Sequence, residues 1–159
     1  MTLAEKLKDA LDQTGAFTSG DRVLEVADGP QHLECHLIAL EPLACAFTRL
    51  ALRADMLSAL SSEGLKKTAE NLSGRLTYLL EPISPIESDA QGCVVQMRSN
   101  PPHKDSDRTS YYELLVSRSG ELSLCRYTRA PKAERQLIPA QVTREVLLRL
   151  ASDFAAVVA

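Results

Sequence analysis

The sequence predicts an α+β protein with an antiparallel sheet, built from a β-meander and hairpins, and with three main helices packed on one sheet face. Three observations predict this class. Turn signals separate short runs with strand character, apolar residues show helical spacing in three segments, and neighbouring strands have hairpin-length connections, which pair strands antiparallel. The expected order is α-βββ-α-ββ(β)ββ-α, in a single domain over residues 1–159.

The first helix and the meander follow from local signals. Leucines recur at helical spacing over residues 3–14, and Thr2 with Glu5 fits a capping box. Three runs with strand character follow, and the tight turns between them predict a three-stranded meander. The expected strands are 22–27, 31–40 and 44–52, joined by turns at Asp28-Gly29 and Glu41-Pro42.

Helical spacing returns from Asp55, and stop signals at residues 71–74 end this second helix. Gly64 offers a break that would divide it into two short helices. Alternating apolar residues then predict a strand over 75–81.

Prolines leave residues 83–88 as an edge strand or an irregular extension, because proline donates no backbone hydrogen bond. A strand over 93–98 follows. Residues 99–109 contain no apolar side chain apart from their prolines, which predicts a mobile solvent loop.

The next hairpin, residues 111–117 with 122–129, has a register that can be argued. A three-residue loop pairs Val116 with Leu122, and Leu114 with Leu124, so that four aliphatic side chains share one face. A last helix over 143–158 is apolar around more than half of its circumference. We therefore expect it to be sandwiched or to pack against a partner.

Composition narrows the function classes. Hydrophobic residues make up 45% and charged residues 25% of the chain, which excludes a disordered or collagenous protein. The net charge of -3 argues against nucleic-acid binding, because such proteins normally carry an excess of basic residues. No apolar run approaches the roughly 20 residues of a membrane span, and the charged first segment is unlike a signal peptide, so we expect a cytoplasmic protein with no membrane partner. The cysteines lack CxxC spacing and are expected to be small buried hydrophobic residues: Cys35, Cys45, Cys93 and Cys125.

The grouping of His32, Glu34, Cys35 and His36 is the one that invites a chemical interpretation. Strand alternation places Cys35 on the face opposite the other three, and the two histidines lie about 13 Å apart, too far to chelate one ion. We therefore assign no metal ligand and no catalytic residue.

The turn at Glu41-Pro42 predicts instead that Glu34 lies opposite Arg49, as an ion pair, and His36 opposite Phe47. A small enzyme or ligand-pocket protein that uses His32 or His36 stays an alternative.

Arg126 and Arg129, with tyrosines nearby, form the best candidate for an anionic ligand. In the preferred hairpin register Arg126 shares a face with Leu114 and Leu124. An anionic-ligand binder that uses Arg126 and Arg129 is therefore a further alternative.

The face of the meander that turns away from the predicted core mixes apolar and polar side chains, which is typical of an interaction surface. Val23, Ile38 and Phe47 are its predicted protein-binding residues. The alternative is that another part of the chain covers this face.

The leucine pattern of the first helix, the meander over 22–52, the second helix and residues 146–158 resemble in order the class I type III secretion chaperones. The resemblance implies a homodimeric α+β protein that binds extended effector segments. The chain departs from that pattern between residues 82 and 129, where it has more strands. The leading prediction is a non-catalytic intracellular protein-binding or adaptor module that acts as a homodimer, with no cofactor assigned.

Overall fold

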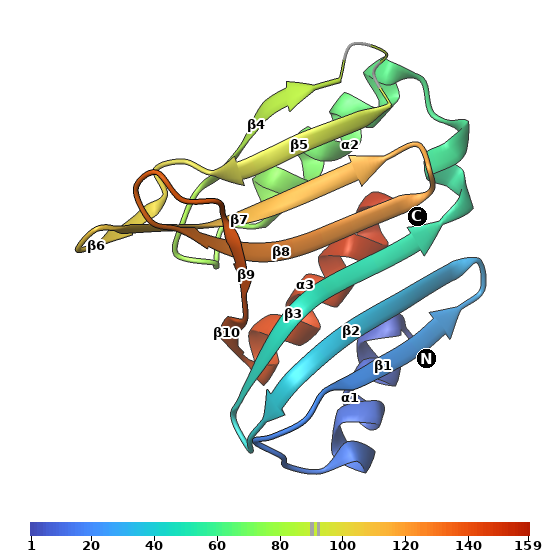
Figure 1. Cartoon of the computed structure of the whole chain (residues 1–159). Helices are drawn as coiled ribbons and strands as arrows, with labels where there is room; N and C mark the ends of the chain where they lie inside the picture. Colours follow the sequence, from blue (N-terminus) through green and yellow to red (C-terminus); the bar gives the residue numbers. More distant parts are fainter. Residues whose placement is uncertain (90, 92) are drawn as a thin grey trace.

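The computed structural model describes residues 1–89, 91 and 93–159, without the side chains of residues 86 and 87. Over these residues the chain forms one antiparallel sheet of ten strands with the helices on one face (Figure 1). The helices are α1 (Leu3–Thr14), α2 (Ser62–Arg75) and α3 (Arg144–Val157), and a 3-10 helix η1 (Asp55–Ala59) precedes α2. The strands are β1 (Arg22–Asp28), β2 (Gln31–Leu40), β3 (Ala44–Ala54), β4 (Ile83–Ser88), β5 (Val94–Ser99), β6 (His103–Asp105), β7 (Arg108–Ser117), β8 (Glu121–Arg129), β9 (Gln136–Ile138) and β10 (Ala140–Thr143). The predicted fold class is confirmed.

The sheet has the order β1-β2-β3-β8-β7-β5-β4, so the N-terminal meander joins the C-terminal strands where β3 pairs with β8. The short strands β10, β6 and β9 pair with β3, β7 and β8 respectively. α3 contacts α1, α2 and β3, and it lies between the other two helices in Figure 1. This position explains its wide apolar surface and favours the sandwiched arrangement.

The helices begin as the sequence predicts, because capping side chains satisfy their first amides. At α1, the Thr2 hydroxyl accepts from the Glu5 amide at 3.1 Å and the Glu5 carboxylate accepts from the Thr2 amide at 2.8 Å. At α3, the Thr143 hydroxyl accepts from the Val146 amide at 3.0 Å. Each of the helices in the described residues is too short or too polar to cross a bilayer.

The helix predicted from Asp55 is interrupted, but not at Gly64. The interruption lies between η1 and α2, where the Ser61 hydroxyl accepts from the Gly64 amide at 3.1 Å and caps α2. Gly64 therefore lies in the first turn of α2. The sequence misses this start because Ser61 can cap the following helix as well as continue a helix.

The strand predicted over 75–81 is wrong. α2 continues to Arg75, and the residues after it are irregular. Leu76 and Leu79 are both buried, whereas Leu80 has a φ of 66° and is 97% exposed. The leucines of this segment pack into the core at a spacing that no strand alternation provides.

The predicted loop over 99–109 is also wrong, because β6 forms a hairpin with the start of β7. This hairpin extends beyond the end of the sheet, at the left of Figure 1. Residues 83–88 form an edge strand with a register shift after Pro85. The strands β9 and β10, for which the sequence predicts no element, link β8 to β3.

The β7–β8 hairpin has the predicted register: Val116 pairs with Leu122, and Leu114 with Leu124. The predicted β2–β3 register is wrong by two residues: Glu34 lies opposite Ala51, and His36 opposite Arg49. Two bulges, one on each side of Leu37, place Leu37 opposite Phe47. Each bulge exchanges the faces of the residues that follow it, so the side chain of Phe47 joins the core and is 1% exposed.

Candidate functional site

The outer face, which we define as the sheet face opposite the helices, carries only part of the predicted protein-binding surface. Val23 on β1 is 49% exposed, and Ile38 is half-buried at a bulge of β2. Phe47 is buried in the core beside the helices. Of the three predicted protein-binding residues, Val23 and Ile38 are therefore accessible to a partner, and Phe47 is not.

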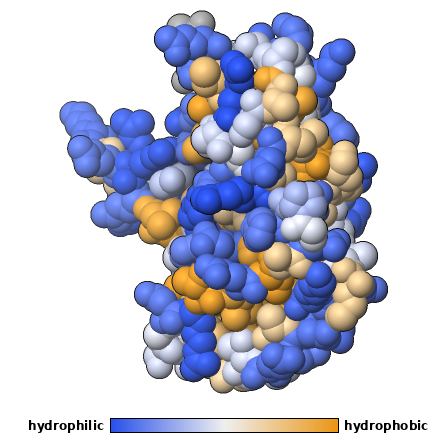
Figure 2. All heavy atoms as spheres, turned by 90° about the vertical axis from the view of Figure 1, so that its right-hand side faces the viewer, coloured by the Kyte–Doolittle hydropathy of each residue, from blue (hydrophilic) through white to orange (hydrophobic). Residues whose placement is uncertain are grey.

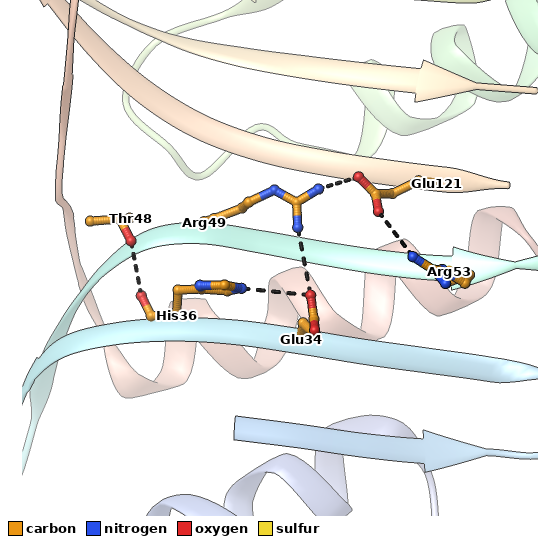
Figure 3. A network of polar contacts seen from close by, with 6 residues as sticks. All are labelled: Glu34, His36, Thr48, Arg49, Arg53 and Glu121. Carbon is orange, nitrogen blue, oxygen red and sulfur yellow. Dashed lines mark hydrogen bonds and ion pairs between the residues drawn. The ribbon is translucent and has the colours of Figure 1, made fainter. Parts of the chain in front are cut away.

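A chain of ion pairs crosses the outer face from β2 to β8 (Figure 3). The Glu34 carboxylate lies 3.6 Å from both Nε2 of His36 and Nη1 of Arg49. Arg49 also pairs with Glu121, whose other oxygen lies 3.8 Å from Nη2 of Arg53. The predicted Glu34–Arg49 pair is thus formed, although the two residues are not directly opposite in the ladder. Because these side chains are partly solvated, each pair contributes only about 0.2–1 kcal/mol, and the network chiefly links neighbouring strands.

A hollow of about 450 Å³ lies beside this network, over β1, β2 and β3. Two small side chains, Ala27 and Ala51, form part of its lining, and the longer side chains of Glu25, Glu34 and Arg53 surround them. Small residues between long ones leave the surface concave. Among the described residues, Glu25 makes no hydrogen bond or ion pair, so this carboxylate is available to a partner.

His32 lies at the same hollow, and His36 is held beside Glu34. In the described part of the chain, no group of three or more histidine, cysteine or acidic side chains is placed to hold a metal ion. Cys35 and Cys45 are buried, and burial raises the pKa of each thiol, to about 11 for Cys45. His32 therefore contributes a polar side chain to the hollow, and His36 belongs to the ion-pair network.

The outer face of β7 carries a buried carboxylate that the sequence did not predict. The Glu113 side chain is only 4% exposed, and its carboxylate accepts from Gln96 at 2.8 Å and from Arg135 at 2.6 Å. The guanidinium of Arg135 also lies 3.9 Å from the centre of the Tyr127 ring. The hydrogen bond to Glu113 raises the pKa of Arg135. Arg135 thereby joins the connection over residues 130–135 to both β7 and β8. The sequence feature that could have predicted this contact is Glu113, a glutamate within the apolar run of β7.

Arg126 and Arg129, the predicted anion-binding pair, are separated. Arg126 lies on the helix side of the sheet, as its register predicts, and its Nη2 donates to the Glu81 carboxylate at 2.9 Å. Arg129 is exposed, and its Nε donates to the carbonyl of Ala133 at 3.0 Å. The two arginines therefore lie on opposite faces of β8, and each has a hydrogen-bond partner within the chain.

Arg126 and Glu81 line a second cleft, of about 620 Å³, between the segment 78–81, the β7–β8 strands and the start of α3. The Arg126 guanidinium lies 4.5 Å from the centre of the Tyr112 ring. Burial raises the pKa of Tyr112, and Arg126 opposes this effect, so the phenol stays neutral at physiological pH.

Comparison with protein-family models, with curated proteins and with solved structures found no match to this chain. The resemblance to the class I type III secretion chaperones therefore rests on the order of the elements.

Proposed function

We propose that this protein is a non-catalytic protein-binding module, and that its binding surface is the N-terminal half of the outer face together with the edge of β1. The observation that carries the proposal is the coincidence of three features at one place. β1 is the last strand of the sheet, Val23 on it is half exposed, and the hollow opens beside it. An extended segment of a partner can add to such an edge through its backbone and place side chains in the neighbouring hollow.

The charge at the hollow predicts which side chain the partner supplies. Glu34 and Glu121 are paired with arginines of this chain, whereas Glu25 is free among the described residues. A lysine or arginine of the partner would pair with Glu25 and avoid leaving it unpaired at the interface. The proposed ligand is therefore an extended segment with a basic residue next to apolar ones.

The module acts in this proposal as a homodimer. The support is the exposed apolar side chains, since Leu43 is 81% and Leu137 51% exposed. Figure 2, which shows the side of the molecule at the right of Figure 1, shows apolar surface in separate patches between hydrophilic side chains. A second copy would thus bind through small apolar patches. Sedimentation equilibrium measures whether the protein forms a dimer.

The test is a selection of peptides from a random display library on the wild-type protein, followed by affinity measurement on variants. We expect the selected peptides to carry a basic residue and to lose at least about tenfold in affinity on Glu25→Lys and on Val23→Asp. Glu63→Lys is the matched charge-reversal control, because Glu63 is an exposed residue in the first turn of α2. Thermal unfolding checks that each variant is folded. Selected peptides that bind all variants equally would remove the assignment of this surface.

A further inference from the structure

The cleft on the helix side of the sheet is separate from the surface proposed above and has its own chemistry. Tyr112 and Arg126 form a cross-strand pair on the face that carries Leu114 and Leu124, which is the face that the helices cover. Much of the remaining lining is apolar, and it includes Leu79, Ile138, Val142 and Val146. A ligand in this cleft would therefore need an apolar body.

The polar part of the lining includes His103, Gln141 and Thr143, and its ion pair is Glu81–Arg126. Each of the two side chains is only 14% exposed, and a single hydrogen bond of 2.9 Å joins Nη2 to Oε2. The other atoms of the pair, Nη1 of Arg126 and Oε1 of Glu81, are also buried, and neither has a hydrogen-bond partner among the described residues. The ion pair that lines the cleft thus carries one unused donor and one unused acceptor.

Buried polar groups without partners are rare in proteins, because each loses its hydrogen bonds to water. The Tyr112 ring does not satisfy them, since Arg126 contacts its π face and Tyr112 makes no hydrogen bond to Glu81. The two free atoms therefore define what a ligand must present: an acceptor for Nη1 and a donor for Oε1.

We propose that this cleft binds a neutral amide attached to an apolar group. An amide presents a carbonyl acceptor and an N–H donor, so it can satisfy both atoms and adds no net charge to a neutral pair. A carboxylate would satisfy Arg126 but would meet the like charge of Glu81, and an ammonium group would meet the like charge of Arg126. The same chemistry is present in a small amide and in a peptide segment.

The test compares three probes that share a leucine body and differ in charge: N-acetyl-leucinamide is neutral, N-acetyl-leucine is anionic and leucinamide is cationic. Binding is followed by the methyl NMR resonances of Leu79, Val142 and Val146 in the wild-type protein. For probes of this size we expect dissociation constants of the order of millimolar for the neutral amide and at least about tenfold weaker binding of both charged probes. A longer peptide that contains the same amide distinguishes the two possible ligands. It should bind more tightly than N-acetyl-leucinamide if the natural ligand is a peptide segment, and no more tightly if the natural ligand is a small amide.

Two variants connect the result to the cleft. Val146→Phe fills part of the cleft from α3 and should abolish the shifts, whereas Val23→Phe on β1 should leave them unchanged. Glu81→Gln removes the negative charge and should reverse the order, so that N-acetyl-leucine binds better than the neutral amide.

The comparison of the three probes on the wild-type protein tests the proposed amide site even if a variant does not fold. Preference for the anionic probe would overturn the proposal in favour of an anion site, and shifts outside the cleft or the absence of binding would overturn it altogether. None of these results depends on peptide binding at β1, so failure here is distinct from failure of the proposed function.

Discussion

Removal of one partner of the Glu81–Arg126 pair should destabilise the protein far more than removal of both. Arg126→Met leaves the Glu81 carboxylate buried without its cation, and Glu81→Met leaves the guanidinium without its anion. Truncation of one partner of a fully buried pair costs about 3–5 kcal/mol. Because 14% of each side chain is still exposed, we expect a cost below that range, about 2–3 kcal/mol for each single variant.

The double variant Glu81→Met/Arg126→Met removes both charges and both unsatisfied atoms. It loses the contact of Arg126 with the Tyr112 ring, which is worth about 0.5–1 kcal/mol, and it gains apolar surface in an apolar cleft. We therefore expect a cost of about 1 kcal/mol, smaller than that of either single variant.

Equilibrium unfolding in urea measures all three free energies, since a domain with a stability of about 5–15 kcal/mol stays folded after losses of this size. The paired control is Arg129→Met, which replaces an exposed arginine and should cost less than about 0.5 kcal/mol. If the cost of the double variant equals the sum of the single costs, the two charges are independent and the reasoning about a buried, coupled pair is refuted.

Three further predictions concern the fold. Phe47→Ala should cost about 3–5 kcal/mol in urea unfolding because Phe47 is 1% exposed, whereas Val23→Ala should change stability by less than about 0.5 kcal/mol; equal costs would contradict the bulged register. Thr143→Ala should cost about 1 kcal/mol through loss of the α3 cap, and a Thr143→Ser variant should retain most of it. Burial raises the pKa of Cys45 from 9.0 to about 11, so the unfolded chain loses its thiol proton first and stability falls by roughly 3 kcal/mol as the pH rises through that window. Unfolding measured between pH 8 and pH 11 should show a shallower fall for Cys45→Ala, and an unchanged fall would assign the effect to other groups.

Much of the fold was predictable because its signals are local. The α1 cap joins residues three apart in the chain, and the β7–β8 register follows from a loop of a few residues. In both cases the alternative arrangement exposes apolar side chains or leaves amides unpaired within the same short segment.

The errors have different causes. The segment after α2 is irregular because Leu76 and Leu79 both pack into the core, and the predicted loop over 99–109 contains a strand because β6 pairs with the start of β7. The side chain of Phe47 lies on the core face and not on the predicted outer face, because two bulges shift the β2–β3 ladder beside it. Turn residues in the sequence do not predict such bulges.

The sequence by itself determined the α+β class, the helix caps and the tight hairpins, since each depends on contacts a few residues apart. Only the tertiary structure decided the joining of β3 to β8, the contact of Arg135 with Glu113 and the contact of Glu81 with Arg126, which are 45 residues apart in the chain. Contacts of that separation are selected by packing summed over the whole chain, and no local pattern encodes them.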